Sequence, residues 1–216
     1  MAADGPSIGV LILAAGKGSR MLSKIPKVLH KVAGQAMLEY VLQSIPLPLT
    51  TSIVIVGSDD LLNNAEFMIL AQRYKANVAL QSEQLGTAHA VSCGMQNLST
   101  AGEILILYGD VPLLKSETLD QLLKEYHDTD ADLMVIGFHY HSPNDYGKFV
   151  LENDKLVAIV EDKNATSKQK ESTFCNSGIM ICSSHLLNDF LAKMNVDSLS
   201  GEYYLTDIIS FASEHK

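Results

Sequence analysis

Apolar residues follow two alternating patterns along the chain. Short continuous runs rich in β-branched residues are typical of strands buried on both faces of a parallel sheet, whereas apolar positions three or four residues apart are typical of amphipathic helices. The continuous runs predict strands at 8–14, 52–57, 77–81, 103–108, 132–140, 147–152, 156–161 and 173–182. The periodic stretches predict helices at 36–45, 60–75, 87–97, 116–128, 184–194 and 203–214.

The order of these elements predicts an α/β fold. In the first half, strands alternate with helices, as in a doubly wound, Rossmann-like sheet. In the second half the strands are shorter and turns are more frequent, which predicts added antiparallel strands that form a wall or lid and make the sheet mixed. The polar stretch 162–172 is expected to be a surface loop or a short helix. A length of 216 residues favours a single domain, 1–216.

A loop of small residues follows the first predicted strand. Small side chains let a phosphate approach the main-chain N–H groups, and in a parallel sheet ligands bind beyond the carboxyl ends of the strands. The loop matches neither the P-loop nor the dinucleotide-binding pattern, because Gly18 follows Lys17 directly and Met21 stands where a third glycine belongs. A tight turn surrounded by solvated lysines is the structural alternative. The end of the strand and the loop contain Leu13, Ala14, Ala15, Gly16 and Gly18.

The distribution of charge supports a binding site for a small anion. The chain has a net charge of −9 and a sequence pI near 5.1, which argues against general affinity for nucleic acid or anionic membranes. Residues 1–31 nevertheless contain five basic residues and one acidic residue, a local balance of +4 that leaves −13 for the remainder. These basic residues are Lys17, Arg20, Lys24, Lys27 and Lys31.

Cysteine use and the N-terminal pattern favour a cytoplasmic location. Three cysteines, Cys93, Cys175 and Cys182, are scattered without metal-ligand spacing, and they are expected to be ordinary reduced thiols. The N-terminal stretch lacks a basic segment before its apolar run, and that run is too short for a signal peptide or a membrane span.

Two further motifs lie at the ends of predicted strands. The segment 81–90 contains Gln81, whose amide could recognise one edge of a nucleobase, followed by Gly86 and Thr87 at a helix start. A solvated Gln81 and a helix-capping Thr87 are an equally acceptable interpretation. Tyr108 and Gly109 precede Asp110, a carboxylate that could bind Mg²⁺ or could cap the next turn.

The second half contains weaker candidates for binding a sugar. Gly147 permits close main-chain approach, and Glu161 and Asn176 carry groups that could hydrogen-bond sugar hydroxyls. Glu161 could equally be a surface charge on an edge strand.

Taken in order, these motifs resemble one family. L-A-A-G-x-G-S-R-M followed by P-K is similar to the pattern shared by sugar-nucleotide pyrophosphorylases. Q-L-G-T-x-H-A, Y-G-D-V-P, Y-G-K, V-E-x-K, N-S-G and G-E-Y-Y-L-T-D are similar, more specifically, to the pyrophosphorylase half of bacterial bifunctional N-acetylglucosamine-1-phosphate uridyltransferases of the GlmU type. The resemblance extends from about Val10 to the end of the chain and implies a fold of the nucleotide-diphospho-sugar transferase type.

The resemblance implies transfer of UMP from UTP to N-acetylglucosamine 1-phosphate with Mg²⁺, in the cytoplasm, to supply a cell-wall (peptidoglycan) precursor. Residues 1–115 would form the nucleotide-binding half and residues 116–216 the sugar-binding half. Arg20 and Lys27 would contact the phosphates as catalytic groups and Asp110 would hold the metal. The nucleotide would lie on Leu13 to Gly16, Gly18, Gln81, Gly86 and Thr87, and the sugar would lie among Tyr108, Gly109, Gly147, Glu161, Asn176 and Thr206.

The chain departs from the family pattern in three respects. Lys148 stands where arginine is usual and Ser177 where threonine is usual. The family's second metal ligand follows the Y-Y-x-T-D segment and its acetyltransferase half follows later, and neither is found before Lys216. Acetyl transfer and that half's trimer contacts are therefore not expected of this chain, and its oligomeric state stays open. The alternatives are a pyrophosphorylase of another sugar phosphate and a non-catalytic binder of nucleotide sugars.

Overall fold

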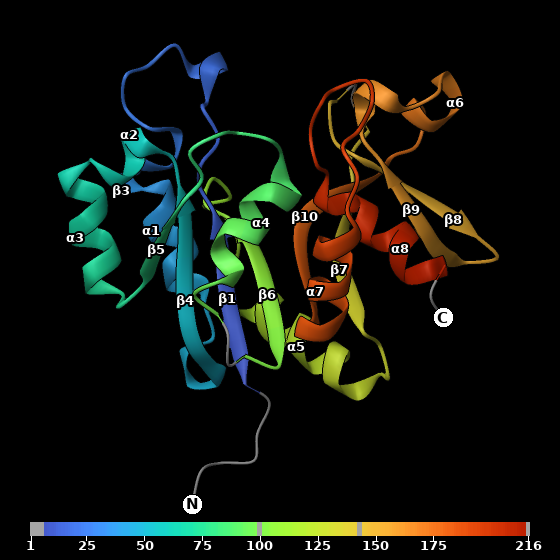
Figure 1. The fold of residues 1–216 in the computed structure, drawn as a ribbon, viewed down its shortest axis with the longest axis horizontal. Coiled ribbons are helices and arrows are strands. Elements are labelled where there is room, and N and C mark those ends of the chain that lie inside the picture. Colours follow the sequence, from blue (N-terminus) through green and yellow to red (C-terminus); the bar gives the residue numbers. More distant parts are fainter. Residues whose placement is uncertain (1–6, 99–100, 142–143, 215–216) are drawn as a thin grey trace, which may run out of the picture.

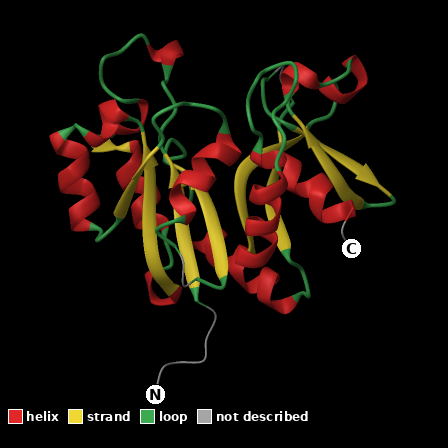
Figure 2. Cartoon of the chain, in the orientation of Figure 1, coloured by secondary structure: helices red, strands yellow, loops and turns green. Residues whose placement is uncertain are grey.

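A computed structural model describes residues 7–98, 101–141 and 144–214. Its strands alternate with helices in the first half and form antiparallel pairs in the second (Figures 1 and 2). The strands are β1 (Ile8–Leu13), β2 (Lys31–Val32), β3 (Gln35–Ala36), β4 (Thr50–Gly57), β5 (Asn77–Leu80), β6 (Glu103–Tyr108), β7 (Leu133–His139), β8 (Lys148–Glu152), β9 (Lys155–Val160) and β10 (Phe174–Ser183). The α-helices are α1 (Met37–Ser44), α2 (Asp59–Leu62), α3 (Ala65–Arg73), α4 (Thr87–Met95), α5 (Ser116–Asp128), α6 (Ser167–Lys170), α7 (Ser184–Lys193) and α8 (Ile208–Glu214).

The main sheet is mixed, as predicted. Its strand order is β5-β4-β1-β6-β10-β8-β9, with β7 paired to β10. The four strands from β5 to β6 are parallel, whereas β10 is antiparallel to β6, to β7 and to β8. The antiparallel strands thus extend the parallel sheet through β10. A separate two-stranded sheet, β2 with β3, was not predicted because each strand has only two residues and no apolar run.

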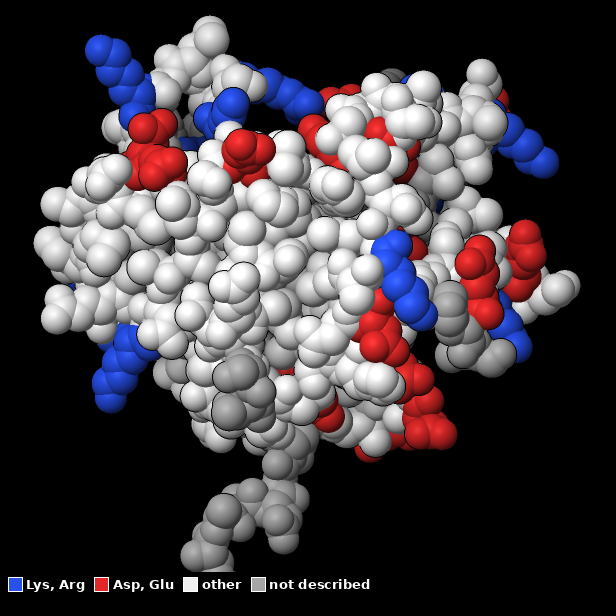
Figure 3. Space-filling view, in the orientation of Figure 1, with Lys and Arg blue, Asp and Glu red and all other residues white. Residues whose placement is uncertain are grey.

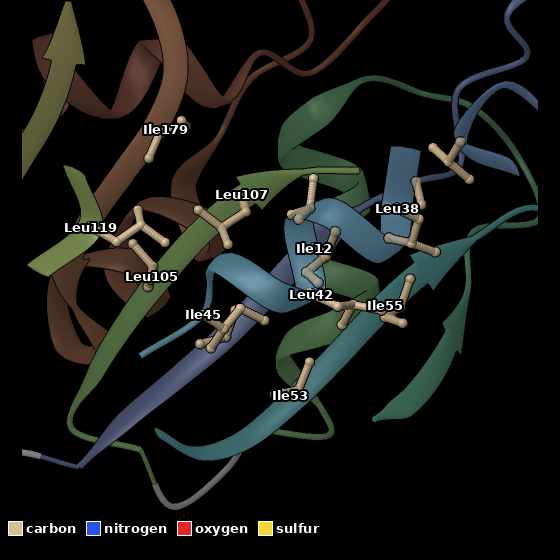
Figure 4. Packing of buried hydrophobic residues seen from close by; sticks show 14 of the residues in the cluster. Ile12, Leu38, Leu42, Ile45, Ile53, Ile55, Leu105, Leu107, Leu119 and Ile179 are labelled. Carbon is tan, nitrogen blue, oxygen red and sulfur yellow. The ribbon is translucent and has the colours of Figure 1, made fainter. Parts of the chain in front are cut away.

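Strand β1 is buried on both faces, which explains its continuous apolar sequence. Ile8, Val10 and Ile12 pack into one hydrophobic cluster, while Leu11 and Leu13 pack into another. Side chains alternate between the two faces of a strand, so both faces need apolar residues when helices cover both. Figure 4 shows the first cluster, in which residues of β1, β4 and β6 meet residues of α1 and α5, among them Ile12, Leu42, Ile55, Leu107 and Leu119.

Two predicted helices differ from the structure. The stretch predicted at 60–75 is divided into α2 and α3 because Asn64 accepts a hydrogen bond from Phe67 N at 3.2 Å and so begins a new helix. The helix predicted at 203–214 begins only at Ile208. A 3-10 helix, Leu205–Asp207, precedes it, and the Tyr203 main chain pairs with Leu85 and Ala88. The stretch 162–172, predicted as a surface loop or a short helix, contains the short helix α6.

Cysteine placement agrees with free thiols, since none of the three forms a disulfide; two are buried and Cys93 is half-buried. Within the described ranges, no helix has the length and apolar character needed to cross a membrane.

Candidate active site

The site lies at the carboxyl ends of the parallel strands. Strand β1 is flanked by β4 and β6 in register, with Leu13 opposite both Val56 and Tyr108. The loops that follow these strands therefore meet at one edge, above the sheet in Figure 1. They surround a cavity of about 330 Å³. Its lining residues are Leu13, Ala14, Ala15, Gly16, Lys27, Val28, Gln81, Gln84, Gly86, Thr87, Ala90, Tyr108, Asp110 and Glu202.

The small-residue loop forms one wall of this cavity, as the sequence predicts. Ala14 and Ala15 are buried, and the Ala14 N–H donates to Val56 O at 2.8 Å. Gly16 has no atom within 4 Å of the position that a Cβ would occupy. The main chain is thus open to a ligand at Gly16 while Ala14 ties the loop to the sheet.

Lys27 and Asp110 both line the cavity, and their side chains form an ion pair. Lys27 begins a short 3-10 helix, Lys27–Leu29, which is anchored because Val28 and Leu29 are buried. Gly18 packs against this lysine: it has a φ of +56°, and an added Cβ would lie 2.8 Å from the Cβ of Lys27. The second glycine of the loop therefore allows the chain to turn back close to Lys27.

The other cations of the basic run lie elsewhere. Arg20 is outside the cavity lining and pairs with Asp145 at 3.4 Å, with both side chains more than three-quarters exposed. Lys31 pairs with Glu66 at 3.3 Å. Figure 3 shows acidic and basic side chains side by side along the upper rim of the molecule. Of the five basic residues that supported a small-anion site, Lys27 alone is among the cavity's described lining residues, while Arg20 and Lys31 pair with acidic residues outside that lining.

Gln81 occupies the cavity wall but is not solvated. Its side chain is 3% exposed, and its amide nitrogen donates to Gly86 O at 3.0 Å and lies 3.1 Å from His89 Nδ1. These contacts fix the orientation of the amide, so the interpretation of Gln81 as a solvated surface residue is excluded. A role in base recognition stays a prediction.

Gly86 is required by a contact between the two halves of the chain. Its φ is +109°, and an added Cβ would lie 2.4 Å from Tyr203 O. Ala88 N donates to Tyr203 O at 2.9 Å and Tyr203 N donates to Leu85 O at 2.8 Å. Thr87 does not act as the helix cap; its hydroxyl instead accepts from Leu205 N at 2.9 Å. The segment around Tyr203 thereby becomes part of the cavity's surroundings.

The predicted sugar-side residues also gather in one place. Thr206 Oγ1 donates to Glu161 Oε1 at 3.0 Å, and Gly147 O accepts from Asn176 N at 2.8 Å. Burial raises the pKa of Glu161, and the hydrogen bond from Thr206 partly offsets that effect. Glu161 is therefore not a freely solvated surface charge.

Tyr108 lines the cavity together with Asp110. Burial raises the pKa of its hydroxyl, and the charges of Glu161 and Asp110 raise it further. A hydrogen bond with Thr87 acts in the opposite direction. The raised pKa keeps the phenol neutral. At Gly109 an added Cβ would lie 3.1 Å from Val28 Cγ1 and 3.3 Å from Leu38 Cδ1, and its place beside the sugar stays a prediction.

The described carboxylates could supply only some of the ligands that a magnesium ion needs. Across the described ranges, no three side chains of the His, Cys, Asp and Glu types are grouped to bind a metal. Asp110 and Glu202 both line the cavity. Mg²⁺ commonly uses one or two carboxylates together with substrate phosphates and water. The donor set thus fits a magnesium ion that is bound together with a polyphosphate.

Several residues at the site were missed by sequence reasoning. Gln84, Val28 and Glu202 line the cavity, and Asp145 pairs with Arg20. Glu202 stands in a motif that was noticed, so its position could have been inferred. Gln84 likewise begins the noticed Q-L-G-T-x-H-A motif. No local pattern marks Val28 and Asp145, because their placement depends on loops that meet only in the folded chain.

The chain is similar in sequence to longer bacterial proteins. It is 38% identical over 208 residues to the Bifunctional protein GlmU of Ruegeria sp. (strain TM1040) and 40% identical over 203 residues to that of Fervidobacterium nodosum. These alignments cover 95% and 94% of this chain but only 45% and 43% of the two relatives. The chain therefore spans less than half the length of the relatives that it matches. The similarity confirms the predicted resemblance to GlmU-type proteins.

The fold is shared with a solved sugar-nucleotide enzyme. A crystal structure of UDP-glucose pyrophosphorylase complexed with UDP-glucose superposes with a TM-score of 0.72 and 15% identity, covering 96% of this chain and 87% of that one. This comparison confirms the predicted fold class. The model of the MobA-like NTP transferase domain matches residues 10–171, which include β1, the small-residue loop and Asp110. On this match, the chain belongs to the family of MobA-like NTP transferase domains.

Proposed function

We propose that this chain transfers UMP from UTP to N-acetylglucosamine 1-phosphate, giving UDP-N-acetylglucosamine and pyrophosphate. The observation that carries the proposal is the placement of Lys27 and Asp110 in the cavity beside a small-residue loop. The Glu161–Thr206 pair is connected to the same cavity, because Leu205, the neighbour of Thr206, donates to the lining residue Thr87. Similarity to GlmU proteins supports the choice of UTP and N-acetylglucosamine 1-phosphate. Residues 1–115 would then hold the nucleotide and residues 116–216 most of the sugar.

At the nucleotide end, the reaction joins two anions. An oxygen of the sugar 1-phosphate attacks the α-phosphorus of UTP; the new phosphorus–oxygen bond forms as the bond to the bridging oxygen breaks, and pyrophosphate leaves with that electron pair. Lys27 and the N–H groups of Ala15 and Gly16 would stabilise the charge that develops, because fixed donors in a partly buried site act strongly on it. The Ala14 N–H does not take part, because it donates to Val56 O. Arg20 would join them only after leaving Asp145.

At the sugar end, neutral and ionised oxygen acceptors would hold the hydroxyl and amide groups. Glu161 is oriented by Thr206, and Gly147 packs close to it, since an added Cβ would lie 3.7 Å from Glu161 Oε2. Asn176 is fixed through its main-chain bond to Gly147. Holding both reactants in this way can supply a large rate advantage, with effective molarities of roughly 10⁵ M or more in favourable cases.

The same residues would accommodate magnesium. Asp110 would hold the ion, and the ion when bound would neutralise phosphate charge. Glu202 also lines the cavity, but it pairs with Lys163 at 3.4 Å. Because Asp110 is engaged by Lys27, that lysine must move away from the carboxylate when the site is loaded. A phosphate oxygen is the natural new partner for its ammonium group.

A pyrophosphate-release assay tests the proposed function. With Mg²⁺ and UTP, we expect release with N-acetylglucosamine 1-phosphate to exceed release with glucose 1-phosphate by at least about tenfold, since groups that pair with substrate hydroxyl and amide groups discriminate strongly. Preference for another sugar phosphate would assign a different pyrophosphorylase. Tight binding of UDP-N-acetylglucosamine without any release would identify a non-catalytic binder instead.

Replacing Lys27 should affect turnover more than substrate affinity. In Lys27→Ala we expect kcat to fall about 100-fold, the usual effect of removing one donor that stabilises transition-state charge, with KM values within about threefold. Lys31→Ala is the matched control, because this lysine belongs to the same basic run but pairs with Glu66. Steady-state kinetics of both variants measure the difference, and an unchanged kcat in Lys27→Ala excludes its proposed role.

Replacing Asp110 should weaken the dependence on magnesium. Asp110→Asn keeps the size of the side chain but removes the charge, so we expect the Mg²⁺ concentration for half-maximal rate to rise at least about tenfold. A titration of the rate with Mg²⁺ at saturating UTP measures this. A titration curve that matches the wild-type curve contradicts Asp110 as a metal ligand.

A further inference from the structure

Lys148 is a buried cation that the proposed chemistry does not use. It is the first residue of β8, and it is only 1% exposed. Its ammonium group donates to Asn144 Oδ1 at 2.5 Å, to Tyr146 O at 2.8 Å and to Cys175 Sγ at 3.7 Å. No Asp or Glu within the described ranges forms an ion pair with it. Lys148 is therefore held by neutral acceptors alone.

A buried lysine with neutral partners is an unfavourable way to fill a core if its only role is packing. Moving an ammonium group out of water carries a desolvation penalty that good pairing only offsets, and an apolar side chain of similar volume often stabilises a core as well or better. An ammonium group has three hydrogens, and Lys148 has a partner for each. Two of the three partners belong to the same short turn, residues 144–146. The charge thus acts mainly on that turn.

The turn ends at the sugar side of the site. Asn144 Oδ1 accepts hydrogen bonds from both Lys148 Nζ and Tyr146 N, the second at 3.0 Å. The turn is therefore held by the lysine and by its own main chain. The next residue, Gly147, is held from the other direction because its carbonyl accepts from Asn176 N at 2.8 Å. A Cβ on Gly147 would lie 3.7 Å from Glu161 Oε2. Lys148 therefore fixes the main chain that faces Glu161.

Among the described residues, an exposed ion pair connects the same turn to the nucleotide side. Asp145 pairs with Arg20 at 3.4 Å, and both side chains are mostly exposed. Exposed ion pairs contribute little to stability, because water screens the two charges. A change in the turn should thus alter sugar binding far more than nucleotide binding.

We propose that Lys148 is a positioning residue that holds the 144–147 turn against Glu161 and Asn176 and so sets the affinity for the sugar phosphate. This inference rests on the proposed function, because it takes Glu161 and its neighbours as the place where the sugar lies. The buried ammonium acts through the turn and does not touch the substrate.

The test compares two substitutions at Lys148 with a control on the same hairpin. Lys148→Met keeps a long side chain but removes the donors, whereas Lys148→Arg keeps a cation. We expect Lys148→Met to raise KM for N-acetylglucosamine 1-phosphate about tenfold while KM for UTP stays within twofold, and Lys148→Arg to restore most of the loss. Lys155→Met, at the exposed start of β9, should match the wild type for both substrates.

A second variant covers the case in which Lys148→Met does not fold. Asn144→Ala removes the side-chain acceptor from the turn and leaves Lys148 in place, so the same selective rise in KM for the sugar phosphate is expected. Unchanged KM for the sugar phosphate in folded variants overturns the inference. An equal rise for both substrates does so too, because it indicates general loss of structure.

Binding measurements separate this inference from the proposed function. By calorimetry, wild-type protein should bind UTP and UDP-N-acetylglucosamine, and Lys148→Met should lose about tenfold in affinity for the second relative to the first. Wild-type protein that binds neither ligand contradicts the proposed function and the inference together. Wild-type protein that binds both, with the same affinity ratio in the variant, contradicts the inference alone.

Discussion

The contact between Lys27 and Asp110 is the interaction on which the site depends. These residues are 83 positions apart in sequence, and they meet because β1 and β6 are parallel neighbours whose following loops emerge at one edge of the sheet. Hydrophobic packing on both faces of β1 fixes that register. A cation and a carboxylate are thereby held in a cavity otherwise lined largely by small and neutral side chains.

The partial exposure of this pair suits a binding site. The side chains of Lys27 and Asp110 are 39% and 24% exposed, so neither has lost all contact with solvent. A fully buried pair is costly to separate, whereas a half-exposed pair can exchange partners at modest cost. In the proposed function, a phosphate group becomes the partner of Lys27 and a metal ion becomes the partner of Asp110. The unliganded ion pair keeps both charges satisfied until then.

Local sequence patterns predicted the core strands and part of the site well. Every long strand was predicted within a few residues because continuous apolar runs mark burial on two faces, as in β1 and β6. The small-residue loop and Asp110 were placed at one edge because they follow such strands. Lys27 lies at the same edge of the sheet, because the buried side chains of Val28 and Leu29 anchor the short 3-10 helix that begins at this lysine.

Contacts between distant loops could not be predicted in this way. Gly86 lines the cavity, where it was predicted to approach a ligand, but its close contact with the Tyr203 main chain is one that no periodicity reveals. Arg20 was grouped with Lys27 by sequence proximity, but the fold turns it toward Asp145. The burial of Lys148 depends on a turn from β8 and on Cys175 of β10. Only tertiary structure brings those groups together.

A crystal structure of the protein with UTP and Mg²⁺ tests the central claim most directly. The account predicts that the triphosphate lies in the cavity beside residues 14–16, with the Lys27 ammonium moved from Asp110 to a phosphate oxygen. A triphosphate bound elsewhere on the surface, with Lys27 still on Asp110, would contradict it.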